Sequence, residues 1–122
     1  MLIRSLHDVD LEPVQMDGAE GASMAVMIGK ADGAPSFSMR QFEVAPGGYT
    51  PRHSHDYEHE VIVLSGRGEV LLDGDYRPIK AGDVVFVPAD EEHQFRVVGA
   101  EPFRFVCLVP GTRNCGEPTP GS

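Results

Sequence analysis

The chain has 122 residues, with 19 acidic side chains against 10 Lys or Arg, so its formal net charge is −9. This length corresponds to one domain that can bury a hydrophobic core. The acidic balance, without any cluster of Lys or Arg, argues against nucleic acid and an anionic membrane as partners. Two cysteines are too few for a disulfide scaffold. Residues 1–10 are charged where a signal peptide is apolar, and no apolar run is long enough to span a membrane. We therefore expect a cytoplasmic protein.

Short apolar runs, separated by glycine and proline, predict the secondary structure. They are rich in β-branched and aromatic residues, which is typical of strands, and no window has the periodicity of a long amphipathic helix. The runs are 24–28, 37–44, 61–64, 69–72, 84–87, 95–98 and 103–109. Turn signals lie between them at 45–48, 65–68, 73–75, 81–83 and 88–90. This spacing predicts an all-β fold, an antiparallel sandwich or barrel.

Three local patterns make this prediction more specific. Asp73-Gly74 predicts a two-residue hairpin, because a type I′ turn needs positive φ at both central positions. Apolar residues change parity within 37–44, which predicts a β-bulge near Arg40 and Gln41. Residues 61–64 are apolar on both parities, which predicts a strand covered on both faces by a second layer or by a dimer partner.

The two ends of the chain look less regular than its centre. Residues 18–23 are small or polar, and residues 111–122 have almost no apolar content. We expect both segments to be loops or tails.

Four of the five histidines fall in two places, His53, His55 and His59 together and His93 alone. Alternate residues of a strand project to one side, so His53 and His55 can share one ion. His59 begins the next apolar run, and His93 would come from a neighbouring strand. Buried imidazoles without an ion would leave ring nitrogens unsatisfied. We therefore predict a metal site formed by His53, His55, His59 and His93, and we expect the fifth histidine, His7, to be solvated.

Two motifs around these histidines resemble those of the cupin superfamily. The first comprises Gly47, His53, His55, Glu60 and Gly66. The second comprises Gly82, Pro88 and His93. The chain departs from the second motif at Asp90, where glycine is usual, and at Val97, where asparagine is usual; these positions affect turns rather than ligands.

The resemblance implies a double-stranded β-helix, or jelly-roll, barrel in a single domain over 1–122. The barrel would span about 36–110, preceded by an N-terminal strand or arm (1–35) and followed by a tail (111–122). It also implies a homodimer and one divalent transition metal, Mn, Fe, Zn, Ni or Cu. The partner would be a small-molecule substrate or ligand. Dioxygenase-type oxidation is the first expectation, sugar-type isomerisation the second, and a non-catalytic binding or sensor module the alternative.

Glu60 competes with His59 for the position of the third ligand. Common cupins use a glutamate there, whereas small single-domain cupins that resemble this chain use four histidines. Adjacent residues on a strand face opposite ways, so the two side chains are not expected to bind one ion together. We favour His59, which leaves Glu60 outward or as a partner that orients an imidazole.

Parity also predicts what surrounds the metal. Tyr49 and Pro51 share the face of His53, and the remaining inward positions are mostly apolar. Candidate polar contacts to a substrate are Arg40, Gln41 and Tyr49. Cys107, between two apolar neighbours, is expected to be a buried small hydrophobe, and Cys115 to be exposed in the tail.

Overall fold

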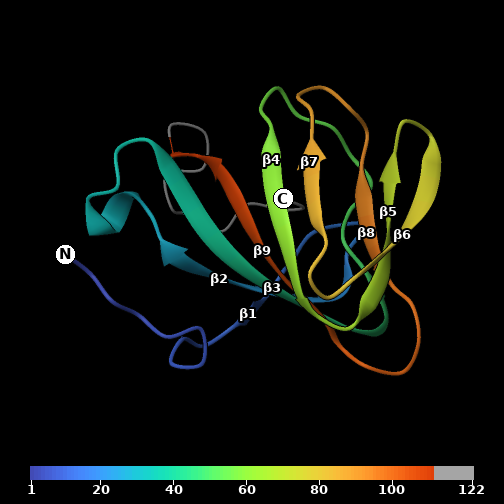
Figure 1. Ribbon diagram of the computed structural model, residues 1–122, viewed down its shortest axis with the longest axis horizontal. Coiled ribbons are helices and arrows are strands. Elements are labelled where there is room, and N and C mark those ends of the chain that lie inside the picture. Colours follow the sequence, from blue (N-terminus) through green and yellow to red (C-terminus); the bar gives the residue numbers. More distant parts are fainter. Residues whose placement is uncertain (112–122) are drawn as a thin grey trace.

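The computed structural model describes residues 1–111, which fold into strands joined by short loops (Figure 1). Its described strands are β1 (Glu12–Pro13), β2 (Glu20–Ile28), β3 (Phe37–Tyr49), β4 (His59–Ser65), β5 (Arg67–Leu72), β6 (Asp75–Lys80), β7 (Val84–Val87), β8 (Gln94–Val97) and β9 (Phe103–Pro110). One turn of 3-10 helix, η1 (Lys30–Asp32), links β2 to β3. Within this range no helix has the length and apolar character needed to cross a bilayer. The all-β prediction is confirmed.

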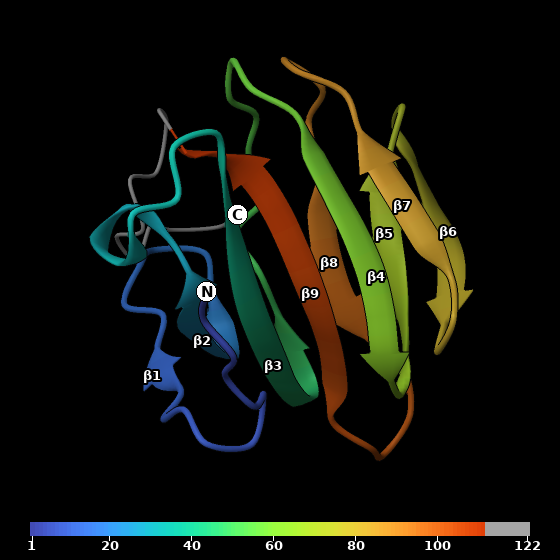
Figure 2. The ribbon, with the colours of Figure 1, turned by 60° about the vertical axis from the view of Figure 1, so that its left-hand side comes forward.

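All strands belong to one antiparallel sheet that curls upon itself. Its order is β6-β5-β8-β3-β9-β4-β7, with β2 added to β3 and β1 to β2. Strands β2, β3, β9, β4 and β7 form one wall, and β8, β5 and β6 lie behind it (Figure 2). The long strand β3 connects the two walls, because its last residue, Tyr49, pairs with Arg96 of β8. This is the jelly-roll barrel that the sequence resemblance implies.

The hairpin between β5 and β6 has the predicted geometry. Asp73 and Gly74 have φ values of 52° and 81°, and Leu72 pairs with Asp75 across the turn. Positive φ at both central positions is the signature of a type I′ turn, which matches the twist of the flanking strands.

The barrel interior has two chemically different ends. One end is a phenylalanine core in which the rings of Phe42 and Phe95 stack on Phe105 with centroids 5.0 and 4.8 Å away. Phe103 completes this group, and all four rings are at most 1% exposed. The buried polar side chains Ser38, Arg40, His59 and His93 lie toward the other end.

The bulge predicted in β3 is wrong. Strand β3 keeps an unbroken register with β9 from Phe37 to Val44, and its inward side chains alternate regularly. The irregularity lies in β2, between Val26 and Ile28. The change of parity in the sequence has another cause: the inward positions of β3 carry polar side chains at one end of the barrel, Ser38 and Arg40, and apolar ones at the other.

Two segments expected to be loops are parts of strands. Residues 20–23 pair with β3, which buries Ala22, and 45–48 continue β3 toward Tyr49. Gly48 permits this close pairing, because a Cβ there would overlap the carbonyl oxygen of Glu20. Local composition underestimates the tendency of such segments to form strands, since the hydrogen bonds that make them strands come from pairing partners elsewhere in the chain. Of the predicted tail, only Gly111 lies within the described residues, and Cys115 falls outside them.

Strand β4 is buried on one face only. Val61 and Val63 point into the barrel, whereas Ile62 on the outer face is 44% exposed. The neighbouring Val84 and Phe86 of β7 are 76% and 59% exposed. Among residues 1–111 nothing forms the second layer predicted over this strand, so a partner molecule is the alternative that stays as a prediction.

Candidate metal centre

The candidate metal centre lies at one end of the barrel, where the loops 50–58 and 88–93 run side by side (Figures 1 and 2). The first loop carries His53 and His55, and His93 ends the second. The backbones of His53 and His93 exchange two hydrogen bonds, with N···O distances of 3.2 and 2.9 Å. This isolated bridge, rather than the strand expected from the His-x-His spacing, holds the two loops together.

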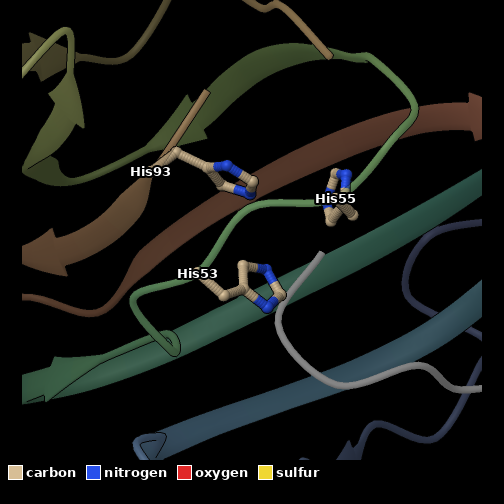
Figure 3. A group of neighbouring side chains, drawn as sticks. All are labelled: His53, His55 and His93. Carbon is tan, nitrogen blue, oxygen red and sulfur yellow. The ribbon is translucent and has the colours of Figure 1, made fainter. Parts of the chain in front are cut away.

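The four histidines of the sequence prediction converge in one cluster, called here the histidine cluster. One ring nitrogen from each of His53, His55 and His93 lies within 4.8 Å of the others (Figure 3). His59, the first residue of β4, joins them from the barrel wall, with its Nε2 2.6 Å from Nε2 of His55. Its ring centroid lies 5.3 Å from that of His93.

The neighbouring Glu60 and the fifth histidine lie elsewhere. Glu60 is exposed on the outer face of β4, because adjacent strand residues face opposite ways. His7 is exposed in the N-terminal segment.

Backbone carbonyls determine the tautomers of two of these rings. Nδ1 of His55 lies 2.9 Å from the carbonyl oxygen of Tyr57, and Nδ1 of His93 lies 3.0 Å from that of Glu91. A carbonyl can only accept, so each Nδ1 carries the proton and each Nε2 keeps its lone pair. The ring of Tyr57 also stacks on His55 with centroids 3.9 Å apart. Such outer contacts are what orients the histidine ligands of metal sites.

A sulfur atom takes the place of the carbonyl beside His59. Sγ of Cys107 lies 3.1 Å from Nδ1 of His59 and 3.6 Å from a guanidinium nitrogen of Arg40. The sulfur can accept the proton of Nδ1, which leaves Nε2 free to face the cluster. Cys107 is therefore buried as expected, but it contacts two polar groups and is more than a small hydrophobe.

Burial keeps His55 and His59 of the cluster uncharged at neutral pH. Desolvation, assisted by nearby positive charge, lowers the pKa of His59 from 6.5 to about 2 and that of His55 to about 4. Burial likewise raises the pKa of the Cys107 thiol. Neutral imidazole is the form that binds metals, so the lone pairs are available without loss of a proton.

The residues present fit a divalent transition metal. At 2.6 Å, the nitrogens of His55 and His59 need a shared proton or a cation bound to both, because two facing lone pairs repel each other. An all-imidazole set suits Zn, Cu, Fe and Ni. These contacts meet the usual requirements of a metal site: convergent donors of one chemical type, three of which have the outer nitrogen already hydrogen-bonded.

The three polar candidates around the site have different positions. Arg40 is fully buried inside the barrel. Gln41 is buried on the opposite face of β3, where it donates to the carbonyl of Leu6 and accepts from Arg104. Tyr49 is 39% exposed, so the prediction that it shares the inward face with His53 is wrong. It fails because the loop after β3 turns between the two residues, and parity does not continue through a loop.

Comparison with known proteins agrees with this fold and geometry. A family model described as a cupin domain matches residues 40–109, more than half of the chain. The chain belongs to the cupin family. The matched segment begins at Arg40 and includes all four clustered histidines and Cys107.

Individual relatives have diverse activities. The chain is 34% identical over 76 residues to 1-methylthio-D-xylulose 5-phosphate methylsulfurylase of Rhodospirillum rubrum, covering 62% of this chain and 49% of that protein. It is 34% identical over 100 residues to the polyketide synthase CurC of Streptomyces cyaneus, covering 80% and 65%. The structure of the polyketide cyclase RemF from Streptomyces resistomycificus superposes with a TM-score of 0.84 at 33% identity, over 99% of this chain and 85% of that one. The chain thus spans about half the length of the methylsulfurylase and just under two thirds of the length of CurC.

Proposed function

We propose that this cupin is a metal-dependent enzyme that acts on a small carbonyl compound. The observation that carries the proposal is the convergence of four imidazoles, three of which have Nδ1 beside a hydrogen-bond partner that directs Nε2 into the cluster. His53, His55, His59 and His93 would hold one divalent ion. When bound, such an ion supplies Lewis acidity that polarises a carbonyl oxygen.

The protein's own residues prepare this centre in three ways. The carbonyls of Tyr57 and Glu91 hold His55 and His93 in the required tautomer. The His53–His93 bridge keeps the two loops in register. The phenylalanine core closes the inner end of the barrel against water, which strengthens electrostatic interactions at the histidine end.

Cyclase-type chemistry is the reaction class that we favour. Two of the relatives, CurC and RemF, are described as polyketide proteins, and the RemF alignment covers nearly the whole chain. Polyketides contain 1,3-dicarbonyl units, whose cyclisation requires an enolised carbon. Dioxygenase-type oxidation is the second candidate, because four imidazoles also suit iron. Sugar-type isomerisation and non-catalytic binding are the remaining alternatives, and the test below distinguishes the first two candidates from them.

Acetylacetone, a small 1,3-diketone, is a suitable probe. Metal-free protein is loaded in turn with Zn²⁺, Mn²⁺ and Fe²⁺, and the bound metal is counted by elemental analysis. We expect one ion per chain and faster deuterium exchange at the central carbon of acetylacetone, followed by NMR. Oxygen uptake with the iron-loaded protein would favour the dioxygenase. Metal binding with neither exchange nor oxygen uptake would contradict action on 1,3-diketones and favour a binding module or an isomerase.

We further propose that the chain forms a homodimer through the outer face of β4 and β7. A hollow of about 380 Å³ lies on this face, lined by Ile62, Val84, Phe86 and neighbouring residues of β3 and β9. Exposed apolar surface of this kind is typical of an interaction site. Light scattering should give a dimer for the wild type, a monomer for Phe86→Asp, and a dimer for the control Val98→Asp. A monomeric wild type would contradict the proposal.

The cytoplasmic location expected from the sequence stays a prediction.

A further inference from the structure

Arg40 is the only Lys, Arg, Asp or Glu among residues 1–111 that is buried. Its side chain has no solvent exposure, and its guanidinium carbon lies 5.4 Å from the ring centroid of Phe42. Burying a cation costs free energy, since the interior solvates it less well than water does. A charge kept in this position therefore invites a functional explanation.

The charge of Arg40 lies beside the histidine cluster. Arg40 pairs with Cys107 across β3 and β9, and Cys107 pairs with Val61 across β9 and β4, two residues from His59. The side chains make the same connection, because Sγ of Cys107 contacts both the guanidinium and Nδ1 of His59.

This arrangement concentrates positive charge at one end of the barrel. The four imidazoles contribute no negative charge, so a bound divalent ion would keep its full charge beside a guanidinium. Two such cations repel each other in a medium of low dielectric constant, and an anion placed near both is attracted by both. Arg40 should therefore weaken the binding of the metal alone and strengthen the binding of an anion to the metal-loaded centre.

We infer that Arg40 determines the ligand class of this centre, which takes an organic oxyanion such as a carboxylate or an enolate. Arg40 acts as a positioning and specificity residue through its field, without direct contact with the ligand. The inference rests on the proposed metal centre and narrows its substrates from carbonyl compounds in general to those that bear or develop a negative oxygen.

The test uses the full chain and its variants Arg40→Met and Arg40→Lys, with Co²⁺ as a spectroscopic metal and acetate as the anion. Affinities for Co²⁺ without acetate, and for acetate on the Co²⁺-loaded protein, are measured by titration of the visible absorption. For Arg40→Met we expect Co²⁺ to bind about tenfold more tightly and acetate about tenfold or more weakly, because a charge several ångströms away contributes this much at an intermediate dielectric constant. Arg40→Lys, which keeps the charge, should stay close to the wild type in both measurements.

The opposite signs distinguish this role from a structural one, since a damaged site would bind both ligands more weakly. If Arg40→Met does not fold, Arg40→Gln, which keeps a donor for Cys107, replaces it. Unchanged acetate affinity, or weaker binding of both ligands, would overturn the inference and leave the metal centre standing. Failure of the wild-type chain to bind Co²⁺ would overturn both.

Discussion

The two ends of the barrel interior are built by the same strands but have opposite chemistry. On β3, Phe42 belongs to the phenylalanine core, whereas Arg40, two residues earlier, lies beside the histidine cluster. Strand β9 shows the same change between Phe105 and Cys107. The phenylalanine rings pack against one another, while the imidazole rings of the histidine end are held by hydrogen bonds to loop carbonyls and sulfur. Apolar packing and polar hydrogen bonding are therefore separated along the strands rather than between domains.

Removing a histidine should produce the largest effect on the metal. His93→Ala deletes one of the four proposed donors and one side of the link between the loops, so we expect metal affinity to fall by more than about a hundredfold. Equilibrium dialysis with elemental analysis measures it. Glu60→Gln, on the outer face of the neighbouring strand, is the matched control and should keep the wild-type metal content. Loss of metal in Glu60→Gln with retention in His59→Ala would show that the ligand assignment is wrong.

Truncation at the other end should affect stability instead. Phe105 touches three other rings of the phenylalanine core, so Phe105→Ala should lower the free energy of unfolding by about 3–5 kcal/mol. Denaturant unfolding of the metal-free protein measures this loss. At low temperature the folded fraction should still bind one metal ion per chain. A variant that stays folded but has lost its metal would contradict the separation between the two ends.

Cys107 lies at the boundary and should have an intermediate effect. Cys107→Ala removes the acceptor beside Nδ1 of His59, so metal affinity should fall about ten- to a hundredfold. Cys107→Ser keeps an acceptor and should lose less metal affinity. The pair of variants therefore distinguishes the loss of the hydrogen bond from the loss of side-chain volume. Competition with a chromophoric chelator gives both affinities. Equal affinity in Cys107→Ala and the wild type would mean that the sulfur only fills space.

Acidification should weaken the histidine end gradually. The folded protein keeps His55 and His59 neutral, with pKa values of about 4 and 2, whereas in the unfolded chain both titrate near 6.5. Below about pH 6.5 the unfolded state therefore binds protons that the folded state does not, and the free energy of unfolding decreases as the pH falls. The slope is at most about 1.4 kcal/mol per pH unit for each histidine, and smaller for His55, which is only partly buried, because solvent screens it.

Thermal unfolding of the metal-free protein between about pH 7 and 5 measures this dependence, in a range where carboxylates stay ionised. His59→Gln, which has no titrating ring, is the control and should have a shallower slope. A melting temperature independent of pH over this range would contradict the lowered pKa values.

The fold was largely predictable because its signals are local. Strand runs such as 84–87 and the Asp73-Gly74 turn depend on residue types and backbone sterics, which neighbouring residues determine. Long-range pairing explains the errors: 20–23 become strand because they pair with β3, and Gly48 of the segment 45–48 lies against the carbonyl oxygen of Glu20. Long-range structure also decided the positions of the candidate substrate contacts, since Tyr49 faces outward and Arg40 is buried inside the barrel.

The sequence by itself determined the strand pattern, the hairpin and which four histidines could meet, since these follow from alternation, turn sterics and spacing. Only the tertiary structure decided which side of each strand faces inward. The pairing of β4 with β7 and β9 directs His59 toward the other histidines and Glu60 outward. The pairing of β3 with β9 places Arg40 beside Cys107 inside the barrel. Pairing between residues far apart in the chain thus buries the charge of Arg40 beside the histidine cluster.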